Sequence, residues 1–220
     1  CLGWTGRVCV AVCKQGHDIT YYNLGVRGAT SADIQSRWFS EVFDRLPHYC
    51  DGRIVFSFGL NDTYLEEEKS RVEVEKSIEN TREILAAAKE MVPILMIGPP
   101  SVLDVNRNIR IANLSKHFSQ VCTELNVPYL DVYTPLQKSE VWLEELAQND
   151  GTHPRAAGYA ELARIIHNWD GWKDWFKNIT VSDRETATLF RAVGKKEMEL
   201  IQESDFMAFP PRLSFQPIFY

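Results

Sequence analysis

The sequence has no long hydrophobic run, no cluster of basic residues and no cluster of histidines and cysteines. Its apolar stretches are far too short to cross a bilayer, so no membrane span is predicted. The net charge of −6 argues against nucleic acid as the main partner. The five cysteines include no Cys-x-x-Cys pair, which favours reduced thiols in an intracellular, cytoplasmic protein. Because no histidine or cysteine cluster accompanies them, we expect neither a metal site nor a cofactor.

Strand-like and helix-like segments alternate along the 220 residues. Short segments rich in β-branched, aromatic or other apolar residues predict strands at residues 19–24, 53–58, 93–97 and 127–132. Apolar residues at helical spacing predict helices at residues 2–15, 32–46, 74–91, 111–125 and 155–169, with Ser31 as the cap of the second. This alternation is typical of a parallel sheet with helices on both faces, whose site lies where the strands end.

The end of the chain has a different character. Aromatic residues near helical spacing, from Trp169 to Phe176, are expected to pack back on the domain. Residues 182–202 are predicted to form one more helix, and residues 206–220 are rich in proline and aromatics without a clear period. We therefore place one domain at residues 1–176 and treat residues 177–220 as a C-terminal extension, partly helical or poorly ordered.

One short motif places an acid and an imidazole three residues apart, in Asn149-Asp150-Gly151-Thr152-His153-Pro154. A carboxylate at this spacing holds one ring nitrogen of His153 and leaves the other free to act as a general base. A loop aspartate beside a surface histidine is the simpler interpretation of so short a motif. The choice between them depends on the rest of the chain.

Three ordered motifs resemble the SGNH-hydrolase superfamily, which includes the GDSL esterases and lipases. Residues 22–31 (Tyr-Asn-Leu-Gly-Val-Arg-Gly-Ala-Thr-Ser) are similar to its glycine block, and residues 58–62 (Phe-Gly-Leu-Asn-Asp) to its G-x-N-D block. Residues 150–154 (Asp-Gly-Thr-His-Pro) resemble its D-x-x-H-P block. The resemblance runs from about residue 3 to 176. It implies a three-layer, flavodoxin-like α/β fold and the hydrolysis of acyl esters through a serine acyl-enzyme.

The resemblance also implies a role for each site residue. His153 is then the base and Asp150 orients it. The backbone N–H of Gly28 and the side-chain amide of Asn61 donate to the oxyanion that forms on the substrate. Asp62 is expected to tie its loop together rather than take part in the chemistry. Taken singly, each of these residues also has an ordinary structural interpretation, in a turn or at a strand end.

The sequence departs from the family at the nucleophile. The family carries its serine in a Gly-Asp-Ser block after the first strand, whereas this sequence contains no Gly-Asp-Ser and opens at Cys1 in the helix that would follow. In the family's strand order 2-1-3-4-5, the first strand lies between residues 19–24 and 53–58. An empty slot there would leave buried backbone groups unpaired, at about 1–3 kcal/mol each. We therefore expect the first strand and the serine to lie upstream of Cys1.

Three functional hypotheses follow. The first is a GDSL-type esterase or lipase that acts on small acyl esters or thioesters. The alternative is a non-catalytic SGNH-like binding or interaction protein. We do not expect another serine to replace the missing nucleophile, because Ser31, Ser57 and Ser101, which lie near strand ends, are not at a strand–turn–helix elbow. A third hypothesis, metal-dependent hydrolysis at Asp150 and His153, requires further ligands that no obvious cluster supplies. Acyl length, leaving group and oligomeric state do not follow from the sequence.

Overall fold

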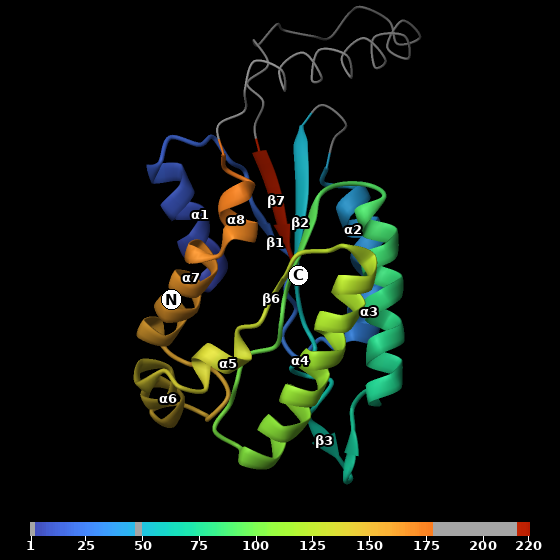
Figure 1. Ribbon diagram of the computed structural model, residues 1–220, viewed down its shortest axis with the longest axis vertical. Coiled ribbons are helices and arrows are strands. Elements are labelled where there is room, and N and C mark those ends of the chain that lie inside the picture. The colour runs from blue at the N-terminus through green and yellow to red at the C-terminus, as the bar shows by residue number, and fades with distance from the viewer. Residues whose placement is uncertain (1–2, 47–49, 178–214) are drawn as a thin grey trace, which may run out of the picture.

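The centre of the fold is a five-stranded sheet in which all strands are parallel (Figure 1). The structure is a computed structural model that describes residues 3–46, 50–177 and 215–220. The strand order is β1-β7-β2-β5-β6. The strands span Tyr22–Asn23 (β1), Asp51–Ser57 (β2), Ile94–Ile97 (β5), Tyr129–Leu130 (β6) and Phe215–Phe219 (β7). This is the predicted α/β fold with the flavodoxin-like order.

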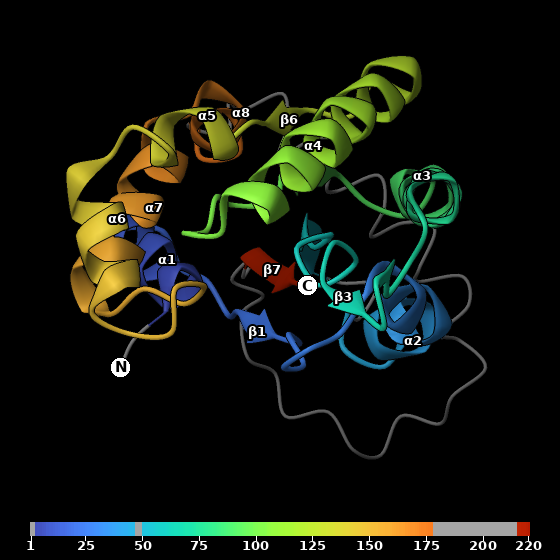
Figure 2. The same cartoon turned by 90° about the horizontal axis from the view of Figure 1, so that it is seen from below.

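Helices cover both faces of the sheet, as expected (Figure 2). One face is covered by three helices: α2 (Ser31–Phe43), α3 (Val74–Lys89) and α4 (Val105–Leu125). The other face is covered by α1 (Trp4–Lys14), α5 (Tyr133–Leu136), α6 (Glu140–Ala147), α7 (Ala156–Asn168) and α8 (Asp170–Asp174). A hydrophobic core lies on each face of the sheet, and strand β2 contributes side chains to both. Its side chains alternate, so Ile54 and Phe56 face the first set of helices and Val55 faces the second.

The five helices predicted before residue 177 are confirmed, and their boundaries differ for local reasons. Helix α4 begins at Val105, six residues before the predicted start, because Asp104 caps it while Val105 and Ile109 are exposed and leave the apolar stripe. The cap of α2 is Thr30 rather than Ser31. The Thr30 hydroxyl accepts from the Asp33 N–H, and the Asp33 carboxylate accepts from the Thr30 N–H, which is a capping box.

A small hairpin, β3 (Leu65–Glu66) and β4 (Lys69–Ser70), follows β2 and was not predicted. Its two turn residues, Glu67 and Glu68, both have positive φ, at 50° and 67°. Glycine and asparagine usually occupy such positions, and their absence removes the sequence signal for this turn.

The slot between β1 and β2, which we expected a strand upstream of Cys1 to fill, is occupied by β7 of this chain. Residue Ile218 pairs with Tyr22 of β1 on one side and with Ile54 of β2 on the other. The Leu24 N–H donates to the Phe219 carbonyl at 2.9 Å, and the Ser57 N–H donates to the Tyr220 carbonyl at 2.7 Å. The last residues of the chain therefore form a central strand, in place of the aperiodic tail expected there. The rest of the expected extension, residues 178–214 with the helix at 182–202, lies outside the described residues.

Strand β7 tolerates a proline in the middle of the sheet. Backbone groups of successive residues point to opposite sides of a strand, and the Tyr220 N–H donates to Val55 of β2. Position 217 therefore points toward β1, whose pairing with β7 begins one residue later, at Ile218. Pro217 therefore lacks its N–H on the side away from β2, so the ladder between β2 and β7 loses no hydrogen bond.

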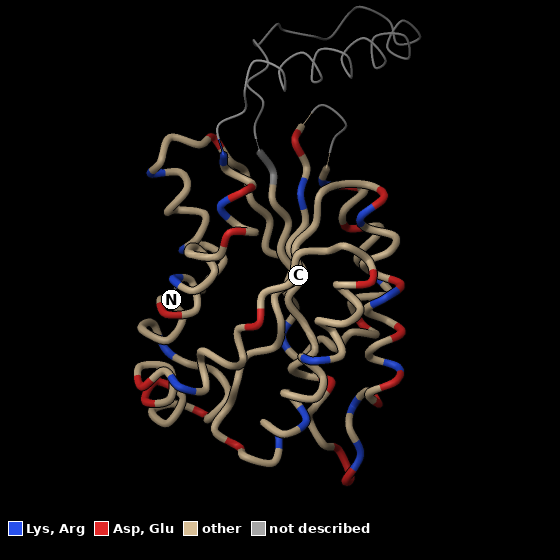
Figure 3. The backbone as a smooth tube through the Cα atoms, viewed as in Figure 1, with Lys and Arg blue, Asp and Glu red and all other residues tan. Residues whose placement is uncertain are grey.

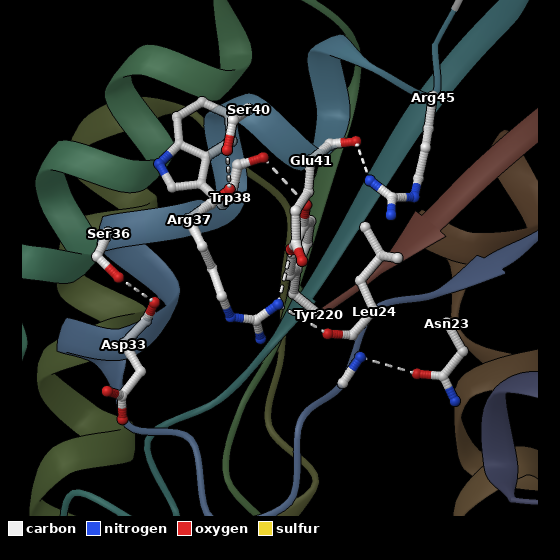
Figure 4. A network of polar contacts seen from close by, with 11 residues as sticks. Asn23, Leu24, Asp33, Ser36, Arg37, Trp38, Ser40, Glu41, Arg45 and Tyr220 are labelled. Carbon is white, nitrogen blue, oxygen red and sulfur yellow. Dashed lines mark hydrogen bonds and ion pairs between the residues drawn. The ribbon is translucent and has the colours of Figure 1, made fainter.

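Tyr220 fastens the end of β7 to α2 (Figure 4). Its hydroxyl donates to the Trp38 carbonyl at 3.0 Å, and its ring stacks on Phe56 with centroids 5.5 Å apart. The Arg37 guanidinium lies 5.6 Å from the centre of the Tyr220 ring and also donates to the Leu24 carbonyl at 3.0 Å. Arg37, which lies on α2, thus links this helix to the ends of both β1 and β7.

Charged residues of both signs are interspersed on the outer helices, the hairpin and the loops (Figure 3). None of the helices in the described segments has both the length and the apolar character needed to span a membrane. Four cysteines are described, and none of them forms a disulfide within the described residues: Cys9, Cys13, Cys50 and Cys122. Burial raises the pKa of both Cys9 and Cys122 to about 12, so these two thiols stay protonated at neutral pH.

Candidate active site

Asp150 and His153 form a direct pair at the loop that enters α7. Asp150 Oδ2 lies 2.7 Å from Nδ1 of His153, while Asp150 Oδ1 accepts from the backbone N–H groups of Thr152 at 2.9 Å and His153 at 2.7 Å. The loop thus fixes the carboxylate through the same residues that carry the imidazole. Because Nδ1 faces the carboxylate, Nε2 is the nitrogen left for proton transfer.

The backbone of this loop suits an ionised aspartate. The N–H of His153 is the largest influence on Asp150 and, with the imidazole and the Thr152 N–H, holds the pKa of its carboxyl well below the usual range. Gly151 has a φ of +76°, which allows the turn that brings these donors to one carboxylate. Both side chains remain about half exposed, at 47% for Asp150 and 50% for His153, so a substrate can reach them.

The loops after β1 and β2 bring the two expected oxyanion residues side by side. Gly28 has a φ of +80°, a conformation that favours glycine, and its carbonyl accepts from Arg71 at 2.7 Å. Asn61 Nδ2 donates to the Ala29 carbonyl at 2.9 Å. An amide nitrogen carries two hydrogens, so this bond fixes the Asn61 side chain and leaves a second donor for a ligand.

Two adjoining hollows lie at the carboxyl ends of the strands. One has a volume of about 200 Å³ and is lined by residues that include Ala29, Asn61 and Tyr220. The other, of about 540 Å³, is lined by Asn23, Gly25, Val26, Arg27, Asn149, Asp150 and His153. Both are bordered by Gly25 and Val26, so the loop after β1 separates the Asn61 side from the His153 side. Gly28 itself lines neither hollow, although both hollows include residues of its loop.

Asp62 ties the loops together, which is the structural role we expected. It is 1% exposed, and its carboxylate accepts from the Ser31 N–H at 2.8 Å and from the Ser77 hydroxyl at 2.7 Å. It therefore joins the loop after β2 to the starts of α2 and α3. Its burial next to Asn61 in the chain makes it a support for the site rather than a group that a substrate meets.

Replacement of Asp62 by alanine is expected to destabilise the domain by about 3 kcal/mol, because two buried donors would lose their acceptor. The free energy of unfolding, measured by urea titration, checks this value. Glu124→Ala on the surface is the control and is expected to cost less than about 1 kcal/mol. Equal costs for the two variants would mean that the Asp62 bonds do not carry the stability assigned to them.

The three serines near strand ends are poorly placed as nucleophiles. Ser31 and Ser101 are fully buried, at 0% exposure. The Ser31 hydroxyl accepts from Asn80 at 3.0 Å, and Ser57 ends β2 with its N–H bonded to the Tyr220 carbonyl. None of them forms a hydrogen bond with His153 within the described residues.

Arg107, which no sequence motif marks, lies on the first turn of α4 and is 7% exposed. It donates to the Leu60 carbonyl, beside Asn61, and to the hydroxyl of Thr152, between Asp150 and His153. An arginine near a helix start has no sequence signature for such a role, because both partners are distant in the chain.

Comparison with known proteins agrees with the geometry. The family model for GDSL-like lipases and acylhydrolases matches residues 2–161. A search of curated proteins finds no match. Among solved structures, Axe2, an acetylxylan esterase from Geobacillus stearothermophilus, superposes with a TM-score of 0.60 at 19% identity, over 77% of this chain and 83% of that one.

A second solved structure, a lipase/acylhydrolase from Enterococcus faecalis, superposes with a TM-score of 0.58 at 25% identity, over 74% of this chain and 82% of that one. Structures described as catalytic mutants of Axe2 replace a serine, an aspartate or a histidine by alanine. In that enzyme the aspartate and the histidine are three residues apart.

Proposed function

Because this chain belongs to the GDSL-like lipase/acylhydrolase family, we propose that it hydrolyses small acyl esters or thioesters through a serine acyl-enzyme, with His153 as the base and Asp150 as its partner. The observation that carries the proposal is the 2.7 Å contact between Asp150 Oδ2 and His153 Nδ1. The catalytic aspartate and histidine of Axe2 have the same spacing, and its description as an acetylxylan esterase makes acetate esters the first compounds to assay.

In the proposed reaction, the serine oxygen attacks the ester carbonyl while His153 Nε2 takes the hydroxyl proton. The negative oxygen of the tetrahedral intermediate accepts from the Asn61 amide and the Gly28 N–H. The intermediate then expels the alcohol, or the thiol of a thioester, which receives the proton from His153. Water, deprotonated by His153, attacks the acyl-serine in turn; the bond to the serine oxygen breaks, and His153 returns the proton to that oxygen, which releases the acid and the free serine.

The proposal places the serine at the junction between β7 and α1, carried by residues that precede Cys1. The ring of Trp4, at the start of α1, lies 5.5 Å from that of Phe219, so the start of this helix is next to the end of the central strand. Tyr220, at the end of that strand, borders the hollow that Asn61 lines. A short Gly-Asp-Ser segment at this junction would stand between the base and the oxyanion donors.

A circularly permuted variant tests the proposal. Gly-Asp-Ser is inserted between Tyr220 and Cys1, and new termini are opened within residues 178–214, so that strand, serine and helix follow in order. We expect a fluorophosphonate probe to label this variant and not the original chain. The matched control carries Gly-Asp-Ala in the insert and is expected to remain unlabelled.

Labelling of the original chain, lost on His153→Ala, would show that another serine has taken the role and would contradict the placement. A folded permuted variant that is neither labelled nor active on acetate esters would instead favour the alternative function, a binding or interaction protein that keeps the SGNH fold without its chemistry.

A further inference from the structure

We propose that Arg107 is a positioning residue that fixes two loops relative to each other. One is the oxyanion loop, which carries Asn61, and the other is the acid–base loop, which carries Asp150 and His153. The inference rests on the proposed function, because it assigns Arg107 a part in the geometry of that site. The two loops are far apart in the sequence: Asn61 follows β2, whereas Asp150 and His153 precede α7. Arg107 reaches both from the first turn of α4.

Each nitrogen of the Arg107 guanidinium has its own acceptor. Nη2 donates to the Leu60 carbonyl at 2.9 Å, and Nε to the Thr63 hydroxyl at 3.3 Å. Nη1 donates to the Thr152 hydroxyl at 3.4 Å, which is the longest of the three contacts. Leu60 and Thr63 flank the pair of residues at positions 61 and 62, while Thr152 lies between the candidate acid and base. A planar, rigid fork of donors spans these acceptors in a way that a single ammonium cannot.

The charge of Arg107 has no ion-pair partner among residues 3–46, 50–177 and 215–220. Its three acceptors are neutral, and its guanidinium lies 5.3 Å from the centre of the Tyr64 ring. Burial, with the nearby Arg110 cation, lowers the pKa of Arg107, while the Asp104 carboxylate and Tyr64 act in the opposite direction. Burying a cation without a direct ion pair is costly, and a neutral side chain would pack the same space at lower cost. We infer that the arginine is kept at this cost because its three donations hold the two loops in a fixed relation.

The same acid–base loop has a second, backbone attachment: the Leu103 N–H donates to the Gly151 carbonyl at 2.9 Å. This contact holds the loop against the segment after β5 but does not touch the Asn61 loop. Among the hydrogen bonds of the described residues, those of Arg107 therefore join both loops through one side chain. Loss of it is expected to leave each loop folded while the distance between His153 and Asn61 becomes variable.

Coupling between the loops can be measured without any activity. Thr152→Val removes the Nη1 acceptor from one loop, and the side-chain amide of Asn61 reports on the other loop in ¹H–¹⁵N spectra. We expect Thr152→Val to shift the Asn61 amide signals in the wild-type chain, and to leave them unshifted in the Arg107→Lys background. Arg110→Lys is the matched control: Arg110 is on the same helix and donates to the Thr63 carbonyl at 3.0 Å, on the Asn61 side, so the coupling should persist.

The kinetic arm uses the permuted variant that carries the junction serine. Arg107→Lys is expected to lower kcat by about 10- to 100-fold with little change in KM, because the reacting groups are misplaced rather than the substrate lost. Arg110→Lys is expected to leave kcat unchanged within about twofold.

An Asn61 signal that Thr152→Val does not move in the wild-type chain, or moves equally after Arg107→Lys, would overturn the inference. The first of these outcomes is decisive even if the arginine variants fail to fold. Absence of esterase activity from every variant would contradict the proposed function, while the spectra would still decide whether Arg107 couples the loops.

Discussion

Removal of residues 215–220 is expected to abolish cooperative folding of the domain. Strand β7 is paired on both sides, and the last three residues of the chain are almost fully buried: Ile218 at 0%, Phe219 at 1% and Tyr220 at 5% exposure. Burial of such side chains stabilises by about 1.5–3 kcal/mol each, and each buried backbone group left unpaired costs about 1–3 kcal/mol. Together these losses match or exceed the roughly 5–15 kcal/mol that typically holds a domain folded.

Thermal and urea unfolding followed by circular dichroism measure this effect. A milder variant, Ile218→Ala, should remain folded and lose about 2–4 kcal/mol, since it leaves a cavity in the core next to Ile54. Val10→Ala, at a side chain that is 45% exposed, is the control and should change stability by less than about 0.5 kcal/mol. A truncated chain with the same unfolding midpoint as the full chain would mean that β7 does not fill the sheet.

The second large effect is expected at His153. In the permuted variant with the junction serine, His153→Ala should lower kcat by about 10²–10⁴-fold, because the serine would lose the group that takes its proton. Acetate-ester hydrolysis at saturating substrate measures the change. His117→Ala, on α4 and outside both hollows, is the control and should leave the rate unchanged within about twofold.

The pH dependence of the same variant tests how firmly the loop holds Asp150. Asp150 remains ionised down to strongly acidic pH, because its backbone and imidazole partners hold its carboxyl pKa well below the usual range. The Asp150 carboxyl should therefore add no step to the pH profile of kcat/KM near the pH at which a free aspartate titrates, about 4. A step of Asp150 in that range would show that its loop does not hold the carboxylate as the contacts indicate.

Local sequence patterns predicted most of the fold and the acid–base pair of the candidate site. Helical spacing of apolar residues located α1, α2, α3 and α7 to within a few residues, because the repeat of a helix is written into adjacent turns of the sequence. The short Asp150–His153 motif predicted a contact that its own loop makes, through bonds between residues at most three positions apart. A structural role for Asp62 was also expected, and its bonds to the Ser31 N–H and the Ser77 hydroxyl agree with it.

Only the tertiary structure revealed the contacts between segments that are far apart in the chain. Strand β7 lies between two others in the sheet, so its residues show no clear alternation, and its partners β1 and β2 lie more than 150 residues earlier in the chain. Arg107 likewise bridges Leu60 and Thr152, 47 and 45 residues away in the chain. Sequence by itself determined the long helices, four of the five strands of the central sheet and the motif that carries the acid and the base. Only the packing of the sheet decided which strand fills its centre and which side chain joins the site loops, because such pairings depend on three-dimensional proximity and leave no local period.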